Sequence, residues 1–495
     1  MNTSEPCLLG GSRFTRRSYI LNGLAAVGLA QRSASAAVRK PNVLFIAVDD
    51  LRPELGCYGR DYIKSPNIDR IARQGMTFQR AYCQQAVCSP SRSSLLTGTR
   101  PDSTKVWDLV THFRDAQPNI VTLPQHFRQN GYFVQGMGKI FHPGYDDPTS
   151  WSTPWKTPAA PTYAGVKTLE VADDDKPTKD KKKAGPPFES AEAPDDFYRD
   201  GKVAAMAVET LRGMKQNAPF FLAVGFAKPH LPFVSPKKYW DLYDPAKIKL
   251  APNPYHPKGS PEWALTNSQE LRNYVGMPAD GPIPDDMARR LKHGYYAAVS
   301  YTDAQIGKVL DELDRQGLRQ NTIIVLWGDH GWKLGEHGEW AKHSNVENDT
   351  NAPLLLSAPG MKSAGKSSNA LVEFVDIYPT LADLAGLPLP SHLEGASFRP
   401  LLDNPDQAWK PAAFSQYPRG QRIMGYSMRT DRYRLTVWLA RSDHSKVEAV
   451  ELYDHQTDPQ ENVNIAAEPA NANLVKGLMA QWRKGWQGAK PPRAK

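Results

Sequence analysis

The run Pro41-Asn-Val-Leu-Phe-Ile-Ala-Val48, followed directly by Asp49-Asp50, indicates the architecture of this chain. Its apolar residues, several of them β-branched, continue without a break between a proline and two aspartates, which is typical of a strand buried on both faces of a parallel sheet. Two other runs have the same continuous apolar pattern, Pro219–Phe226 and Thr322-Ile-Ile-Val-Leu-Trp327. The second leads through a glycine into Asp329-His330. We therefore expect a buried sheet built around these runs.

Helical patterns separate the strand candidates. The predicted helices are Ile68–Gln74, Leu123–Gln129, Gly201–Met214, Met287–Arg315 and Val375–Ala385, and further strands are predicted at Tyr132–Met137 and Pro353–Ser357. Alternation of strands and helices predicts an α/β fold, in which a large and mostly parallel sheet is flanked by helices on both faces.

The pattern of predicted secondary structure divides the chain into a large and a small part. Residues 38–400 carry the alternating pattern, interrupted at 157–193 by a stretch rich in Pro, Lys, Asp and Ala that lacks periodicity and is interpreted as a surface insertion. Beyond it, hairpin-like segments such as Met424–Met428 precede a final helix near Ala470–Trp486. Residues 401–495 are therefore predicted to form a small C-terminal α+β subdomain.

Composition excludes several classes of protein. The 495 residues include 10% aromatic side chains and 4 cysteines, which fits neither a disordered chain nor a disulfide scaffold. No apolar run approaches the roughly 20 residues that cross a bilayer, so no mature membrane span is expected. The formal net charge of +9 is compatible with binding to nucleic acid or to another anionic polymer, or with a role in solubility alone. Nucleic acid is the weakest of these, because only Lys181-Lys-Lys183 forms a concentrated basic run.

The N-terminal segment has the order of an export signal. Arg16-Arg17 precedes the weakly apolar Leu21–Ala30, and Ala34-Ser-Ala36 offers small residues for a peptidase. The arginine pair indicates the twin-arginine route, with residues 1–37 as the signal and a periplasmic or secreted product. The alternative is a basic, disordered N-terminus.

Metal-type side chains follow two of the predicted strands, at Asp49-Asp50 and at Asp329-His330. In open parallel sheets, ligands bind beyond the carboxyl ends of the strands, so these side chains are expected to converge. Three carboxylates and an imidazole without cysteine favour a hard divalent cation, Ca²⁺ or Mg²⁺, over zinc. Taken alone, each pair is more often a turn or a helix cap.

A third motif changes that balance. Cys88-Ser-Pro-Ser-Arg92, continuing as Ser93-Ser-Leu-Leu-Thr-Gly98, resembles the signature of the type I sulfatases, whose cysteine is oxidised after translation to formylglycine. The resemblance runs from Pro41 to the last helix and is closest to the iduronate-2-sulfatase members of the family. The stretches that carry it include Leu55-Gly-Cys-Tyr-Gly59, Gln84-Gln-Ala-Val-Cys88, Gly138-Lys-Ile-Phe-His-Pro-Gly144, Lys228-Pro-His-Leu-Pro-Phe233 and Gly331-Trp-Lys-Leu-Gly-Glu-His-Gly-Glu-Trp-Ala-Lys342.

The resemblance implies an alkaline-phosphatase-like sandwich and a set of site residues. The metal would be held by Asp49, Asp50, Asp329, His330 and the modified Cys88. Of the other residues, Arg92 and Lys139 would hold the formylglycine diol, His142 would handle its second proton, His230 would protonate the leaving oxygen, and Lys342 would bind the sulfate or a neighbouring carboxylate. The alternatives without a catalytic role are that Lys139 is a solvated surface lysine and that His142 is a structural histidine.

The resemblance thus implies an exported sulfatase, dependent on Ca²⁺ and on formylglycine at Cys88, that acts on a 2-O-sulfated iduronate or other hexuronate in an acidic polysaccharide. Its expected partners are the sulfated glycan and a formylglycine-generating enzyme. The alternatives are a sulfatase for another sulfated sugar, or a formylglycine-dependent phosphonate or phosphate ester hydrolase. A non-catalytic glycan-binding protein is disfavoured because the nucleophile and metal residues are all present.

Overall fold

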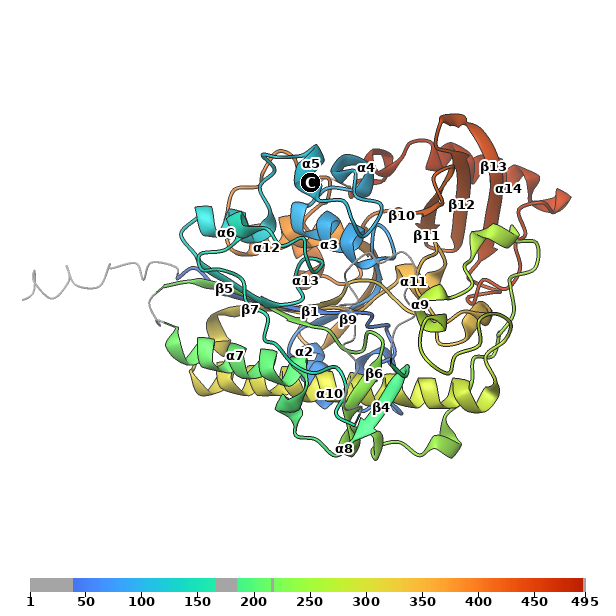
Figure 1. The fold of residues 1–495 in the computed structure, drawn as a ribbon. Coiled ribbons are helices and arrows are strands. Elements are labelled where there is room, and N and C mark those ends of the chain that lie inside the picture. Colours follow the sequence, from blue (N-terminus) through green and yellow to red (C-terminus); the bar gives the residue numbers. More distant parts are fainter. Residues whose placement is uncertain (1–38, 166–184, 215–217, 493–495) are drawn as a thin grey trace, which may run out of the picture. The chain divides into compact units, whose positions relative to one another are not determined.

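The central sheet of the computed structural model has the predicted α/β character. The structure describes residues 39–165, 185–214 and 218–492, and within these ranges seven strands form one sheet in the order β3-β5-β1-β7-β8-β2-β9 (Figure 1). Their bounds are β1 Asn42–Val48, β2 Met76–Tyr82, β3 Phe133–Gly138, β5 Phe220–Phe226, β7 Thr322–Gly328, β8 Leu354–Ser357 and β9 Lys366–Glu373. Strand β1 pairs in parallel with both β5 and β7, and β3 continues the parallel array beside β5.

One strand runs against the others. The predicted strand near Pro353–Ser357 exists as β8, but it is antiparallel to both β7 and β2. The expectation of a mostly parallel sheet is confirmed, and β8 is its exception.

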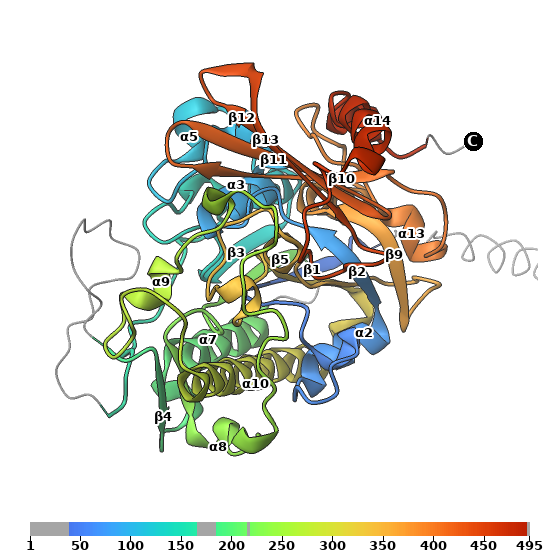
Figure 2. The same ribbon diagram turned by 90° about the vertical axis from the view of Figure 1, so that its right-hand side faces the viewer.

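Strand β1 explains why helices cover both faces of the sheet. All seven of its residues are buried, and their side chains alternate between two hydrophobic cores. One core is shared with α2 (Pro66–Gln74), α7 (Arg199–Gly213) and α10 (Asp285–Arg315), and the other with α3 (Cys88–Thr97), α6 (Leu123–Gln129) and α12 (Ile377–Leu384). Helices α7 and α10 lie side by side on one face, with α3, α6 and α12 on the other (Figures 1 and 2).

The C-terminal part forms the predicted α+β unit. Strands β10 (Ala412–Arg419), β11 (Ile423–Thr430), β12 (Tyr433–Ala440) and β13 (Asp443–Asp454) form an antiparallel sheet that packs against α14 (Ala472–Trp482) (Figure 2). Strand β10 reaches the segment before α3, since Ser415 Oγ donates to the Cys83 carbonyl at 2.6 Å and the Gln416 N–H donates to the Gln84 carbonyl at 2.8 Å. This sheet is therefore braced against the loop that leads to Cys88.

The remaining elements are short. They are β4 (Phe188–Ala191), which pairs in parallel with β6 (Phe233–Pro236), and the helices α4 (Pro101–Thr104), α5 (Phe113–Ala116), α8 (Lys237–Trp240), α9 (Gln269–Arg272), α11 (Glu347–Thr350) and α13 (Arg399–Asp403). Among the described residues, no helix is both long and apolar enough to span a membrane.

Two sequence expectations fall partly or wholly outside the described residues. The signal at 1–37 lies entirely outside them, and so does the centre of the 157–193 insertion, at 166–184. The described ends of that insertion are built into the fold. Tyr163 is buried and donates from its hydroxyl to the Pro186 carbonyl at 2.7 Å, and strand β4 follows.

Candidate active site

The predicted site residues converge at the carboxyl edge of four neighbouring strands, β3, β5, β1 and β7. Lys139 follows β3, His230 lies in the loop after β5, Asp49 and Asp50 follow β1, and Asp329 and His330 follow β7. Backbone pairing continues just past the strand ends: the Asp49 N–H donates to the Phe226 carbonyl at 3.1 Å, and the Asp329 N–H donates to the Val48 carbonyl at 3.3 Å. The sheet register thus fixes which side chains meet.

Arg92 lies at the centre of the carboxylates and is fully buried. Its Nε donates to Asp329 Oδ2 at 2.9 Å and its Nη2 to Asp49 Oδ1 at 3.0 Å. Its Nη1 donates to the carbonyls of Lys139 and Ile140 at 2.6 and 3.0 Å. Beyond the expected contact with residue 88, this arginine therefore holds two carboxylates and the loop after β3 in one geometry.

Cys88 is the first residue of helix α3 and is buried. Its Sγ lies 3.5 Å from Asp49 Oδ1 and 3.4 Å from His330 Nε2. Burial, reinforced by the Asp49 carboxylate, raises the pKa of the Cys88 thiol well above its ordinary value. A protonated thiol is a poor nucleophile, whereas the helix N-terminus favours negative charge on a group placed there.

The donor set fits a hard divalent cation. Potential ligand atoms of Asp49, Asp50, Cys88 and His230 all lie within 4.8 Å of one another, as do those of Cys88, Asp329 and His330. Asp50 adopts a φ of 56°, an uncommon conformation for a residue other than glycine, which turns the chain at the metal-type pair. Three buried carboxylates and a nearby imidazole are the donors that Ca²⁺ or Mg²⁺ takes in proteins.

Lys139 and His142 enter the cluster from the loop after β3. Lys139 Nζ donates to Asp49 Oδ2 at 2.7 Å, so Lys139 is not a solvated surface lysine. Burial, with the charge of Lys139 in support, lowers the pKa of His142 to about 3. The His142 imidazole is therefore neutral near pH 7.

His230 has the opposite character. Its Nε2 lies 3.1 Å from Glu270 Oε1 and 3.8 Å from Asp50 Oδ2. Burial is the largest influence on the pKa of His230 and lowers it, with Lys342 in support, but the carboxylates of Asp50, Asp49 and Glu270 together outweigh them, and the net pKa is raised. The two histidines are thus shifted in opposite directions, His230 toward its protonated form and His142 toward its neutral form.

Lys342 and Glu270 complete the buried cluster. Lys342 Nζ contacts both oxygens of Asp50, at 3.1 and 3.2 Å, and Glu270 Oε1 at 3.0 Å. Sequence analysis missed Glu270, because it lies in the short helix α9 within an irregular segment and no motif marks it.

An aromatic and basic rim adjoins this end of the site. His343 Nε2 lies 3.9 Å from Glu270 Oε2, and the His343 ring is 6.0 Å from the ring of Tyr417. The Arg419 guanidinium lies over Tyr417 at 4.9 Å. Sequence analysis missed these residues too, although His343 directly follows Lys342. Aromatic faces and cations are side chains that suit an acidic sugar.

A mostly parallel sheet flanked by helices, whose carboxyl edge gathers buried carboxylates, cations and a cysteine at a helix N-terminus, defines an alkaline-phosphatase-like fold.

Within that class, the chain belongs to the sulfatase family. The family profile described as Sulfatase matches residues 41–387, and the profile described as N-sulphoglucosamine sulphohydrolase, C-terminal, matches residues 335–486. The protein is therefore a sulfuric ester hydrolase.

The chain is similar to several other proteins in sequence or in fold. The chain is 38% identical to iduronate 2-sulfatase of Mus musculus, over 88% of this chain and 93% of that protein, and 37% identical to iduronate 2-sulfatase of Homo sapiens, over 93% and 97%. In fold it is similar to a protein solved with its substrate D-glucosamine-2-N,6-O-disulfate, at a TM-score of 0.73 and 23% identity, over 91% of this chain and 98% of the other. Phosphonate monoester hydrolase of Agrobacterium radiobacter gives a TM-score of 0.73 at 22% identity, over 90% and 95%.

Proposed function

We propose that this sulfatase removes the 2-O-sulfate of an iduronate or related hexuronate in a sulfated polysaccharide, through a formylglycine formed from Cys88. The observation that carries the proposal is the position of Cys88, at the first residue of α3 and within 3.5 Å of Asp49 and His330. The choice of sugar is supported by the two iduronate 2-sulfatases at 38% and 37% identity.

Two groups supply chemistry that the twenty side chains lack. A formylglycine at position 88 supplies an aldehyde hydrate, whose hydroxyl can attack sulfur. A divalent cation, Ca²⁺ or Mg²⁺, held by Asp49, Asp50, Asp329, His330 and residue 88, supplies neutralisation of the sulfuryl oxygens.

The charged side chains around the cluster orient the reacting groups. Arg92 fixes Asp49 and Asp329, so the two carboxylates stay in place whatever occupies the site. Lys139 and Lys342 bring positive charge to Asp49 and Asp50 and can turn toward a sulfate group as it enters. Preorganised cations of this kind stabilise the charge that develops on sulfate-ester cleavage.

The two histidines divide the proton transfers. His230, beside Asp50 and Glu270, is the group that would protonate the leaving sugar oxygen. His142 is the group that would take the proton of the second hydroxyl that a formylglycine hydrate would present at position 88. Leaving-group protonation and base catalysis each typically contribute about 10²–10⁴-fold in rate.

We assign recognition of the sugar to the rim formed by His343, Tyr417 and Arg419. His343, Tyr417 and Arg419 present two rings and a guanidinium next to Lys342. A uronate carries its carboxylate on C5, across the sugar ring from the 2-O-sulfate, so a site for it needs a cation apart from those that hold the sulfate. Arg419 is our choice for that second role.

A panel of substrates tests the proposal. Disaccharides carrying a single sulfate at the 2-O position of iduronate, at the 6-O position or on nitrogen, together with an aryl phosphonate monoester, are compared by kcat/KM. We expect the 2-O-sulfate to lead by about 10²-fold or more, the discrimination available when buried polar groups pair with only one substrate. A preference for another sulfate position would reassign the sugar, and a preference for the phosphonate would reject the sulfatase activity. Peptide mass at position 88 reports the modification independently.

We further propose that the protein is exported by the twin-arginine route. The basis is the order of Arg16-Arg17, an apolar segment and Ala34-Ser-Ala36. Cell fractionation of the parent and of the Arg16→Lys, Arg17→Lys variant tests this. We expect the variant to stay in the cytoplasm, and equal export of the two proteins would contradict the proposal.

A further inference from the structure

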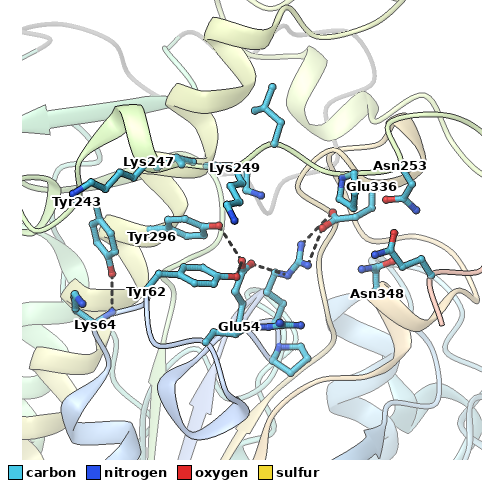
Figure 3. Close-up of a pocket in the computed structure, with 18 of the residues that line it drawn as sticks. Glu54, Tyr62, Lys64, Tyr243, Lys247, Lys249, Asn253, Tyr296, Glu336 and Asn348 are labelled. Atoms are coloured by element: carbon cyan, nitrogen blue, oxygen red, sulfur yellow. Dashed lines mark hydrogen bonds and ion pairs between the residues drawn. The ribbon is translucent and has the colours of Figure 1, made fainter.

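A pocket of about 980 Å³ is lined in part by Arg52, Pro53 and Glu54, which follow shortly after Asp50. None of the ten predicted site residues lines it. Its walls come from the segment after β1, the loop before Asn253, helix α10, the loop after β7, the region of α11 and residues 459–460 (Figure 3). A volume of this size is that of a ligand site.

The pocket is rich in cations. Its lining includes Arg52, Arg60, Lys64, Lys247, Lys249 and Lys292, against the carboxylates Glu54, Asp244, Glu336 and Glu347. Arg60, Lys64, Lys247 and Lys249 are exposed. In the view of Figure 3, Lys249 lies between Tyr296 and Glu336.

The pocket's central carboxylates are already engaged. Arg52 forms a forked pair with Glu336, at 3.2 and 2.9 Å, and contacts Glu54 at 3.1 Å. The hydroxyls of Tyr62 and Tyr296 both donate to Glu54 (Figure 3). These bonds leave Glu54 and Glu336 committed to Arg52 and the tyrosines rather than to the lysines.

Lys292 is the unusual member of the set. The residue is only 6% exposed, and it lines the pocket. Its Nζ lies over the ring of Tyr296, 5.9 Å from the centroid, and no side-chain hydrogen bond or ion pair to Nζ is seen among the described residues. Burial lowers the pKa of Lys292, although Glu54 and Glu336 oppose that shift. An ammonium that lines a pocket without a direct ion pair is placed to pair with an anionic ligand that enters the pocket.

Aromatic side chains stand beside these cations. The rings of Tyr62 and Tyr296 lie 5.8 Å apart, and Tyr62 is 45% exposed. An exposed aromatic face next to lysine ammonium groups can stack on a sugar ring while the lysines bind its anionic substituents.

We propose that this pocket, centred on the Lys292 ammonium, is a second saccharide site that binds a sulfated or carboxylated sugar unit outside the catalytic centre. The choice of a sugar over another anion rests on the proposed function, under which the substrate is an acidic polysaccharide. The pocket shares a backbone segment with the metal-type pair, since the Tyr295 hydroxyl donates to the Asp50 carbonyl at 2.8 Å and accepts from the Arg52 N–H at 3.0 Å. The pocket and the metal-type pair are therefore adjacent along the chain and share the hydroxyl of Tyr295.

Equilibrium binding tests the proposal without turnover. The Cys88→Ala protein and the same protein carrying Lys292→Met are titrated calorimetrically with a heparin-derived octasaccharide at 0.15 M salt. Methionine keeps the length of the side chain and removes its charge. We expect Lys292→Met to weaken binding by about tenfold, the effect of losing one charge-assisted contact. Lys292→Arg keeps the affinity, and Lys362→Met, at an exposed lysine outside the pocket, leaves it unchanged.

Two further measurements separate a ligand site from a structural lysine. With Cys88 intact, Lys292→Met hydrolyses 4-nitrocatechol sulfate at the parent rate. Its Tm stays close to that of the parent, because the substitution removes no direct ion pair and keeps the length of the side chain. If Lys292→Met failed to fold, Lys249→Ala at the exposed rim of the pocket would serve as the second variant, with the same expected loss of affinity.

The competing outcomes are distinct. Equal octasaccharide affinity for the parent and both pocket variants would overturn the proposal, as would an equal loss in Lys362→Met or no binding by the parent. Inorganic sulfate is titrated alongside, and binding as tight as that of the octasaccharide would assign the pocket to the free anion instead. Failure of the proposed function appears separately, as absence of sulfate release in the substrate panel.

Discussion

Arg92 shows how much of the site depends on single residues. Its guanidinium contacts carboxylates after two different strands, and it also binds the loop that carries Lys139. No water is available at a fully buried position to replace these bonds. The roles of Asp49 and Asp329 therefore depend on Arg92 as much as on the sheet.

Replacing Arg92 by methionine removes the buried guanidinium that pairs with Asp329 and leaves Asp49 with Lys139 as its cationic partner. We expect a loss of about 3–5 kcal/mol in the free energy of unfolding, and no sulfate release. Denaturant unfolding measures the first. The matched control is Arg80→Met, since Arg80 pairs at the surface with the exposed Asp431 and should cost below about 1 kcal/mol. Equal costs for the two variants would contradict the central role of Arg92.

Glu270 is a positioning residue in this account, because it acts through His230 and Lys342. We expect Glu270→Gln to lower kcat by about 10–100-fold, the usual effect of removing a carboxylate that orients a functional side chain. Glu270→Asp should recover part of that loss, and Tm should change little in both variants. A rise in KM with unchanged kcat would assign Glu270 to substrate binding instead.

At the scale of elements, the site depends on how closely strands β3 and β5 approach at their carboxyl ends. Gly138 has a φ of 67°, and a Cβ there would lie 2.0 Å from the Gly225 carbonyl oxygen. The next residue is Lys139, so a shift of the backbone at Gly138 moves Lys139 away from Asp49.

Gly138→Ala should therefore destabilise the fold by about 2–4 kcal/mol, combining overpacking with an unfavourable φ, and should lower activity as well. Gly131→Ala provides the control, because Gly131 also has a positive φ of 86° but no atom lies within 4 Å of its Cβ position. We expect that control to cost about 1 kcal/mol and to keep full activity. Thermal unfolding and sulfate release measure both. Equal effects would show that φ alone matters.

The C-terminal sheet is joined to the main sheet region through buried ion pairs. Glu347 in α11 accepts from Arg434 on β12, and Arg434 also pairs with Glu461 at 2.6 Å. Burial raises the pKa of Glu347, but Arg434 and Arg429 outweigh it and lower the pKa to about 2. Because the pKa of Glu347 is lower in the folded state than in the unfolded state, its charge stabilises the fold above about pH 4.3. That stabilisation is lost as pH falls toward 2.

Glu347→Gln should consequently destabilise the protein by about 3 kcal/mol at pH 7. The difference between parent and variant should shrink as pH falls from about 4.5 to 2. Urea unfolding across that pH range measures it. A difference that stayed constant with pH would show that Glu347 contributes through packing rather than charge.

At the scale of the whole molecule, the strands that could be predicted are those buried on both faces. β1, β5 and β7 are continuous apolar runs and could be located from the sequence. β2 and β9 could not, because β2 contains Gln79 and Arg80 and the exposed start of β9 is polar. The direction of β8 also escaped prediction, since an apolar run does not encode which way it pairs.

The same limit applies to the site. Asp49, Asp50, Asp329 and His330 could be predicted because they directly follow apolar strands, and Cys88 because it opens a motif. Glu270 and Lys292 could not. Their significance comes from tertiary contacts: Glu270 meets Lys342 across 72 residues, and Lys292 lines a pocket formed by six separate parts of the chain.

Removing divalent cations should weaken the whole fold as well as activity. Asp49, Asp50 and Asp329 are buried close together, so a bound cation relieves their mutual repulsion and stabilises the folded state. We expect chelation to abolish sulfate release, and added Ca²⁺ at a hundredfold excess over its Kd to restore about 3 kcal/mol of stability. Asp50→Asn should show a smaller Ca²⁺-dependent rise in Tm. The absence of any Ca²⁺ effect on Tm would contradict the metal assignment.

The central claim is that Cys88, converted to formylglycine within this cluster, cleaves a uronate 2-O-sulfate. Its most direct test is sulfate release from a disaccharide with a non-reducing-end 2-O-sulfated iduronate, by protein co-produced with a formylglycine-generating enzyme and supplied with Ca²⁺. We predict that the parent releases sulfate and that Cys88→Ala does not. Release by both proteins, or none by a parent whose formylglycine is confirmed by peptide mass, would contradict the claim.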